Sequence, residues 1–214
     1  MFPVDARLRP QGREGDLVIT PEQLSIYFAR HARPWEAISY LRLRLVAGDS
    51  AVGEQVLAAA HDGIAEIAQR SEFDQELAEM RSRLEASDTS PNLKTGPGGT
   101  YDIDFLAGRL QAKNQVWGGG TLLERIGLLR YHKLLGEKEF RMLTDSVRFL
   151  RTLEHCVRLV TGRSGKWLPV SEHANACVVK LMAEAAGHLE GRAVSGVLTD
   201  VLGQTRTIYR EYQF

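Results

Sequence analysis

The sequence predicts a mainly α-helical protein, a helical bundle preceded by a short β-hairpin. After residue 20, apolar residues recur every three or four positions through most of the chain, which is the period of an amphipathic helix. The first 19 residues instead show two short stretches typical of strands, separated by a turn. Proline and glycine clusters divide the periodic part into separate helices.

The β-hairpin is predicted at the front of the chain. Residues 2–9 alternate apolar and polar side chains, the period of a half-buried strand. Residues 10–15, Pro-Gln-Gly-Arg-Glu-Gly, have the composition of a turn, and residues 17–19, Leu-Val-Ile, predict a second strand. Because an isolated hairpin is only marginally stable, we expect further strands to pair with it. An exposed strand edge could also pair with a second copy, so a homodimer stays open.

The helices are predicted from their starting residues and from their periodicity. Thr20-Pro21-Glu22-Gln23 combines an N-cap, a proline in the first turn and a capping-box partner. The strongest apolar period, from Phe140 to Val160, predicts one long helix. The predicted helices cover residues 21–32, 34–48, 52–69, 73–85, 101–113, 122–135, 140–160, 174–186 and 194–212.

Composition places the chain among ordinary globular proteins. Hydrophobic residues make up 43% and charged residues 25%, which excludes a disordered or collagen-like chain. The 27 basic and 27 acidic residues cancel, which argues against a general nucleic-acid binder. Cys156 and Cys177 are too few for a disulfide framework, and no apolar run approaches the roughly 20 residues of a membrane-spanning helix. We therefore expect a cytoplasmic protein without nucleic-acid or membrane partners.

Two segments are more specific than these patterns. Residues 4–18 read Val-Asp-Ala-Arg-Leu-Arg-Pro-Gln-Gly-Arg-Glu-Gly-Asp-Leu-Val, and residues 93–105 read Leu-Lys-Thr-Gly-Pro-Gly-Gly-Thr-Tyr-Asp-Ile-Asp-Phe. The first resembles the strand–turn–strand of the glutamine synthetase (glutamate-ammonia ligase) adenylyltransferase family, and the second resembles its glycine loop opening into a helix. Trp35-Glu36 and residues 42–49 resemble an intervening helix of that family.

The resemblance implies a nucleotidyltransferase-fold domain followed by a helical bundle. Residues 1–48 would then be the C-terminal part of the nucleotidyltransferase domain, with the hairpin as its remnant, and residues 49–214 the bundle. The implied reaction transfers AMP from ATP, with Mg²⁺, to a tyrosine of glutamine synthetase, under control of a PII signal protein. The family also includes a related half that removes AMP by phosphorolysis. The stretch Val-Asp-Ala-Arg-Leu-Arg-Pro slightly favours the attaching half.

Asp5 is the predicted catalytic residue and metal ligand. It corresponds to the third of the three carboxylates that the family's metal site requires, and the sequence shows no counterpart of the first two. We therefore expect this chain alone to be catalytically incomplete. Without the resemblance, a solvent-facing strand aspartate would be the better interpretation. A non-catalytic helical interaction module is the alternative outside the enzyme class.

Arg7 and Arg9 would share the strand face of Asp5. Their guanidinium groups suit nucleotide phosphates, but pairing with Asp5 or with helix carboxylates is an equally good interpretation.

The glycine loop is the second predicted site. Lys94, Gly98 and Gly99 are predicted to bind nucleotide or phosphate, because a glycine-rich turn at a helix start exposes N–H groups. The spacing is not that of a P-loop, and a plain structural loop is the alternative. Asp102 lies in the first helical turn, where it could cap amides or fix Lys94, whereas Asp104 faces elsewhere. Both carboxylates are predicted to have structural or substrate-contact roles. The family usually has Glu at the position of Asp104.

No other catalytic or metal motif is found in the sequence. The histidines are dispersed, no Gly-x-Ser-x-Gly stretch occurs, and the two cysteines fit buried thiols better than nucleophiles.

Overall fold

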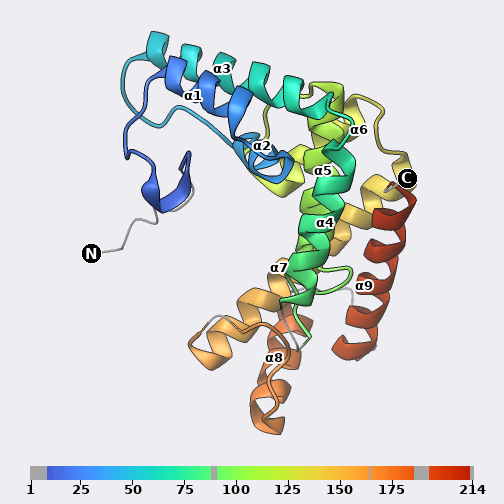
Figure 1. The fold of residues 1–214 in the computed structure, drawn as a ribbon. Coiled ribbons are helices and arrows are strands. Elements are labelled where there is room, and N and C mark those ends of the chain that lie inside the picture. Colours follow the sequence, from blue (N-terminus) through green and yellow to red (C-terminus); the bar gives the residue numbers. More distant parts are fainter. Residues whose placement is uncertain (1–8, 88–90, 164, 186–192, 213–214) are drawn as a thin grey trace. The chain divides into compact units, whose positions relative to one another are not determined.

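The computed structural model describes residues 9–87, 91–163, 165–185 and 193–212 (Figure 1). Within these ranges it contains nine α-helices, one short 3₁₀ helix at Gly12–Glu14 and no strand. None of these helices is long and apolar enough to cross a bilayer. The α-helices are α1 (Pro21–Arg30), α2 (Pro34–Tyr40), α3 (Ser50–Ala68), α4 (Phe73–Ala86), α5 (Thr100–Asn114), α6 (Leu122–Tyr131), α7 (Glu137–Thr161), α8 (Glu172–Ala185) and α9 (Val194–Glu211).

Most predicted helices are confirmed, and their caps explain where they begin. The Thr20 hydroxyl accepts from the Gln23 N–H, and the Gln23 side chain accepts from the Thr20 N–H, so the predicted capping box of α1 is present. The Asp49 carboxylate accepts from the N–H groups of Ala51 and Val52 and starts α3. The prediction for α2 was wrong at its end, because the helix stops at Tyr40 rather than near residue 48.

The predicted β-hairpin is not found in the described residues. Its first strand lies mostly outside them, and residues 17–19, predicted as its second strand, form no strand. Residues 9–15 instead close a tight turn, in which the Arg9 side chain donates to the Gly15 carbonyl at 2.8 Å and Gln11 has a φ of 61°. Leu17 and Val18 are mostly exposed, so their side chains do not pack as those of a half-buried strand would.

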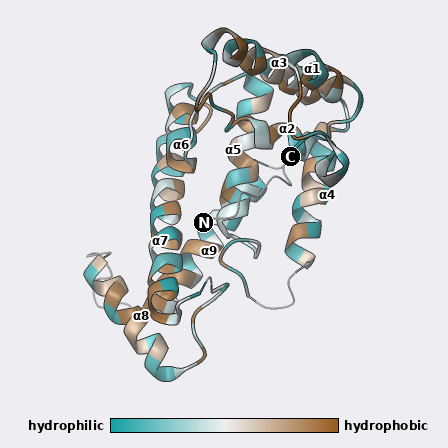
Figure 2. Cartoon of the chain, turned by 90° about the vertical axis from the view of Figure 1, so that its left-hand side faces the viewer, coloured by the Kyte–Doolittle hydropathy of each residue, from teal (hydrophilic) through white to brown (hydrophobic). Residues whose placement is uncertain are grey.

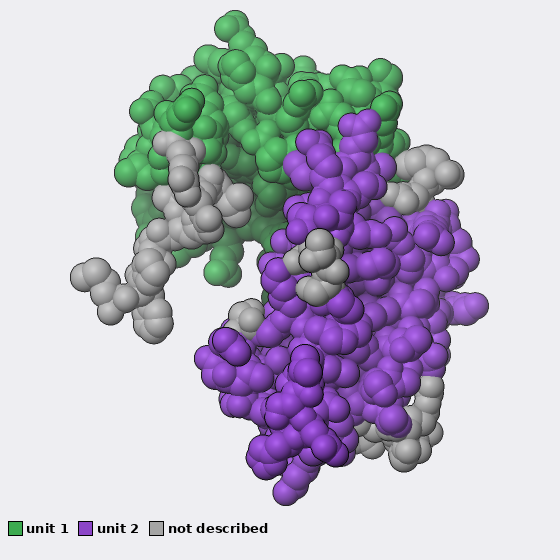
Figure 3. Space-filling model, turned by 60° about the horizontal axis from the view of Figure 1, so that its bottom comes forward, with its two compact units in different colours: residues 1–77, 108–121 green, residues 78–107, 122–214 purple. Residues whose placement is uncertain are grey.

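The chain divides into two compact units, which Figure 3 distinguishes by colour. Unit 1 comprises residues Met1–Leu77 and Gly108–Thr121. In it α3 packs against α1 and α2, and the ring of Phe28 lies directly over Gly63 of α3. The Arg70 guanidinium donates to the carbonyls of Phe28 and Ala32, which satisfies the C-terminal end of α1.

Unit 2 comprises residues Ala78–Ala107 and Leu122–Phe214. The long helix α7 packs against α6, α8 and α9. Figure 2 shows hydrophobic and hydrophilic bands alternating along α7, as an amphipathic helix requires. Buried side chains from the glycine loop, α7, α8 and α9 form one core: Leu93, Leu150, Leu153, Cys156, Val157, Val178, Met182, Val194 and Leu198.

Candidate functional site

The glycine loop before α5 is tied together by its own hydrogen bonds. The side-chain oxygen of Asn92 accepts from the N–H groups of Lys94 and Thr95, and the Asn92 carbonyl accepts from Gly96. The Gly99 N–H donates to the Gly96 carbonyl, and the Thr100 N–H donates to the Leu93 carbonyl. These main-chain donors are therefore already committed within the loop.

Gly98 adopts a conformation that favours glycine and lies against α9. Its φ is 75°, and a Cβ added there would come within 1.9 Å of the Leu202 carbonyl oxygen. The Gly98 N–H donates to a carboxylate oxygen of Asp102 at 2.8 Å. This bond joins the loop to the first turn of α5.

Asp102 is the centre of a buried ionic cluster formed by Arg81, Glu85, Asp102 and Arg206. The Asp102 side chain is fully buried, as is that of Arg81, whose Nε donates to it at 2.6 Å. Arg206 on α9 donates to both Asp102 oxygens at 3.0 and 3.1 Å. The Glu85 carboxylate lies 3.1 Å from Arg206, so two cations balance two anions. Such balance is needed because an unpaired charge in this environment would be costly.

The charges of this cluster and its burial affect one of its members, Arg206, and a neighbouring side chain, Tyr209. Burial lowers the pKa of Arg206, but the charges of Asp102 and Glu85 outweigh that effect, so its pKa is raised. Burial raises the pKa of the Tyr209 phenol to about 12, and the Arg206 guanidinium lies 5.3 Å from that ring. Both side chains are therefore held in their protonated forms.

The contacts of this cluster suit a structural role, holding elements together, better than a catalytic one. Asp102 accepts from the Gly98 amide and from two guanidinium groups, which occupy both carboxylate oxygens. Arg81 also donates to the Gly96 carbonyl, so the same guanidinium holds the loop and the helix. The arrangement fixes α4, the loop, α5 and α9 at one point.

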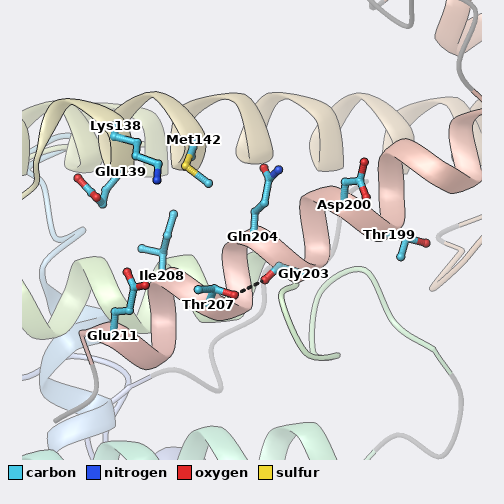
Figure 4. A pocket seen from close by; sticks show the side chains of 10 residues that line it. All are labelled: Lys138, Glu139, Met142, Thr199, Asp200, Gly203, Gln204, Thr207, Ile208 and Glu211. Atoms are coloured by element: carbon cyan, nitrogen blue, oxygen red, sulfur yellow. Dashed lines mark hydrogen bonds between the residues drawn. The ribbon is translucent and has the colours of Figure 1, made fainter.

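A separate groove of about 410 Å³ runs between α7 and α9. In Figure 4 the side chains of Lys138 and Met142 from α7 point toward those of Gln204 and Ile208 from α9. Gly203 forms part of the groove wall and leaves it open, because no atom lies within 4 Å of a Cβ built there. The lining mixes charged, amide and apolar groups.

Comparison with known proteins places the chain in a family. Residues 1–59 match the family model described as glutamate-ammonia ligase adenylyltransferase, and residues 67–210 match the one described as GlnD PII-uridylyltransferase. The chain is 34% identical over 212 residues, 94% of its length, to a bifunctional glutamine synthetase adenylyltransferase/adenylyl-removing enzyme of Mycobacterium tuberculosis. It is 34% identical over 177 residues, 79% of its length, to the protein of that name from Streptomyces avermitilis. The chain belongs to the glutamine synthetase adenylyltransferase family.

The match covers a limited part of these adenylyltransferase relatives. The aligned region is 21% of the Mycobacterium tuberculosis protein and 18% of the Streptomyces avermitilis protein. The chain therefore spans about a fifth of the length of the curated relatives it matches. Both relatives carry the names of two opposing activities.

The residues that the adenylyltransferase resemblance pointed to are only partly brought together. Asp5 and Arg7 lie outside the described residues, and Arg9 bonds to Gly15 within its own turn. No group of three or more His, Cys, Asp or Glu side chains that could hold a metal is found in the ranges the structure covers.

In the glycine loop, Gly98 and Asp102 are directly bonded, as the predicted capping role of Asp102 requires. Lys94 is not fixed by Asp102, because its exposed ammonium lies 5.0 Å from the ring centroid of Tyr101. Asp104 pairs with Arg125 of α6 at 2.5 Å, so its side chain faces a different partner from that of Asp102. Phosphate binding by Lys94, Gly98 and Gly99 stays a prediction. It is not favoured by the main-chain N–H groups of these residues, because they already donate to Asn92, Asp102 and Gly96.

Arg81 and Arg206 are the site residues that the sequence analysis missed. A signal for Arg81 was present, since Phe73, Leu77 and Arg81 follow one another at four-residue spacing on one stripe of α4. All three are buried. A charged residue on such an apolar stripe predicts a buried partner of opposite charge.

Proposed function

We propose that this chain is the part of a nucleotidyltransferase that carries the end of its catalytic domain and the helical bundle behind it. The complete enzyme transfers AMP from ATP to a tyrosine hydroxyl of glutamine synthetase and thereby regulates nitrogen assimilation. The hydroxyl attacks the α-phosphorus and pyrophosphate leaves. Attachment is favoured over removal, and the chain by itself is catalytically incomplete.

The observation that carries this proposal is the match of most of the chain to bifunctional adenylyltransferases. The model covering residues 67–210 is named for a PII-uridylyltransferase, which would point to UMP and a different protein substrate. Curated relatives from Streptomyces and Mycobacterium, however, align across 79–94% of the chain, and their names are those of adenylyltransferases. This favours AMP and glutamine synthetase over UMP and PII.

The domain assignment belongs to the same proposal. Residues 1–48 would complete the nucleotidyltransferase domain, and residues 49–214 would form the bundle. The match of residues 1–59 to the adenylyltransferase model supports a different origin for the front of the chain. The two compact units divide the chain at other positions than residue 48, because they are defined by contacts within the fold and not by family matches.

Asp5 would serve as one carboxylate ligand of Mg²⁺ in the complete enzyme, and Arg7 and Arg9 would approach the nucleotide phosphates. Bound Mg²⁺ would supply charge neutralisation at the phosphates. The remaining ligands would come from carboxylates without a counterpart in this sequence. Lys94, Gly98 and Gly99 would contribute near the phosphates, and Asp104 would support the helix behind them.

The helical body would hold the glycine loop in place and present a docking surface for glutamine synthetase. The buried ionic cluster supports the first role, because Arg81 and Asp102 each bond to the loop and to other helices. A PII signal protein is the proposed regulatory partner of the complete enzyme.

Two alternatives make different predictions. The AMP-removing half of the family would use inorganic phosphate to release ADP from modified glutamine synthetase. A helical interaction module without chemistry would bind glutamine synthetase and catalyse neither reaction. Because the relatives are named for both attachment and removal of AMP, removal is the main alternative to the proposed activity.

The deciding experiment separates binding from chemistry. Pull-down of glutamine synthetase from the same organism should succeed, whereas transfer of labelled AMP from Mg²⁺–ATP by the purified chain should be undetectable. Transfer by the chain alone would contradict its incompleteness. ADP release from adenylylated glutamine synthetase with phosphate would favour removal.

Nucleotide binding by Asp5 is tested by calorimetry with Mg²⁺–ATP. The Asp5→Asn variant is compared with Asp16→Asn, which changes an exposed carboxylate in the same front segment. We expect weak or no binding to the wild-type chain. Tight binding lost only in Asp5→Asn would show that the metal site is more complete than proposed.

A further inference from the structure

Exposed apolar side chains gather in one stretch of unit 1. The structure describes eleven large apolar side chains as exposed, and seven of them lie between residues 17 and 52. Val46 is 83% exposed. Single exposed apolar residues are ordinary, whereas a concentration of them marks a surface that another molecule covers. The seven are Leu17, Val18, Ile26, Leu43, Leu45, Val46 and Val52.

Part of this stretch borders a groove between the α2–α3 connection and the first turns of α3. The groove has a volume of about 530 Å³, and we call it the 43–57 groove. The apolar side chains of Leu45, Val46 and Val52 are among those that line it, and they remain exposed. Its lining contains one cation, Arg44, and one anion, Asp49, so its formal charge is zero.

The main chain beside this groove is also open. The N–H groups of Arg42 and Leu43 donate to carbonyls at the end of α2. From Arg44 to Ala47, no hydrogen bond is formed within the part of the chain that the structure describes. Unpaired main-chain groups next to apolar side chains form a template for pairing with another chain.

We propose that the 43–57 groove is the contact face of a homodimer, in which the groove of a second copy covers it across a two-fold axis. A two-fold contact requires a self-complementary surface. The groove is lined by one cation and one anion, so in the proposed contact Arg44 of each copy would pair with Asp49 of the other. The net charge of zero adds no repulsion between copies. Antiparallel pairing of residues 44–47 would satisfy the open main-chain groups.

This proposal is independent of the adenylylation reaction. It concerns association of the chain with itself, so it needs neither ATP nor glutamine synthetase. It also moves the predicted dimer contact from the front hairpin, which the described residues do not form, to the α2–α3 connection.

Sedimentation analysis of the whole chain over a wide range of concentration tests the proposal. The wild type should shift from the 23.9 kDa of one chain to twice that mass. Val46→Asp should remain monomeric, because it places a charge in the centre of the apolar contact. Leu159→Asp is the matched control, since Leu159 is a similarly exposed apolar residue on α7 in unit 2. Equal helical circular dichroism would show that both variants fold.

The charges of the groove provide a second test. Arg44→Asp should weaken the dimer about tenfold, because like charges would then face each other across the axis. Adding Asp49→Asn should restore part of the affinity. Asparagine removes the charge but still caps α3, so the helix is preserved.

Three outcomes would overturn the proposal. A wild-type chain that stays monomeric at every concentration excludes the second copy as the occupant of the groove. A dimer that survives Val46→Asp, or one that Leu159→Asp also abolishes, places the contact on another face. Inter-chain disulfide formation by Val46→Cys in a Cys177→Ser background would support the two-fold contact independently.

Discussion

The main-chain N–H of Gly98 donates to the carboxylate of Asp102 at 2.8 Å, and both residues are buried. The same carboxylate oxygen accepts from Arg206 at 3.0 Å. One side chain therefore fixes the irregular loop before α5, the first turn of α5 and a distant helix. The groups around Asp102 therefore have to match it in charge and in shape.

Asp102→Asn should lower the free energy of unfolding by about 3–5 kcal/mol, because two buried or half-buried guanidinium groups lose their common anion. Urea denaturation measures the change. Asp145→Asn is the control, because Asp145 is mostly exposed and lies 3.9 Å from Arg148. That variant should change stability by no more than about 0.5 kcal/mol. A loss as small as the control's would show that Asp102 is not a structural joint.

Gly98→Ala should destabilise the chain by more than about 1 kcal/mol, since the new Cβ would meet the Leu202 carbonyl and φ is positive. Gly203→Ala, on the neighbouring turn of α9, should stabilise by about 0.5–1 kcal/mol. Its Cβ would meet no atom within 4 Å. The two variants are compared by thermal and urea unfolding. Equal effects of the same sign would contradict the tight approach at Gly98.

Gly63→Ala should destabilise unit 1 by about 1–3 kcal/mol, because a Cβ would lie 2.3 Å from Cγ of Phe28. In a double-mutant cycle, Gly63→Ala should cost less in a Phe28→Ala background, since that change removes the Cγ and Cδ1 atoms that the new Cβ would meet. Gly127→Ala, on α6, has open space around the new Cβ and serves as the control. Additive effects of Gly63→Ala and Phe28→Ala would show that the two positions are not coupled.

Alkaline pH should destabilise the chain through Tyr209. Its folded pKa is raised from 10.0 to about 12, so between these values the unfolded state releases a proton that the folded state retains. The stability present below pH 10 is therefore lost as pH rises, by about 1.4 kcal/mol for each pH unit. Tyr209→Phe should make the fall in unfolding free energy over this range less steep, and Tyr40, whose pKa burial also raises to about 12, should account for part of the fall that remains. Tyr131→Phe is the control, because that side chain is 80% exposed, and a similar flattening there would exclude the assignment to Tyr209.

Most of the helical fold could be predicted from local sequence. Capping residues such as Thr20 and Gln23 act within one turn, and the apolar stripe of α7 repeats along a single element. Both signals lie within a few residues of the structure they specify. The predicted end of α2 was wrong although the sequence carried a signal for the true end, since residues 41–45 alternate Leu and Arg. That is a period of two, which does not favour a helix.

The partners of the candidate site could not be predicted in the same way. Asp102 could be assigned a capping role from its place in the first turn of α5, but Arg81 and Arg206 lie 21 and 104 residues away. No local pattern selects those two among the other arginines. The second strand of the predicted hairpin, residues 17–19, was wrong for a related reason, since β-branched and apolar residues specify a strand only where a neighbouring strand pairs with it.

The separation of 104 positions between Asp102 and Arg206 also affects the order of events during translation. A growing polypeptide has Arg81, Glu85 and Asp102 outside the ribosome well before Arg206 is made. Until then, Asp102 has one guanidinium partner instead of two, and α9 is not yet present to cover the loop. This region therefore completes its folding only when α9 has been synthesised. A product terminated before residue 206 would expose buried charge and become a substrate for cellular proteases.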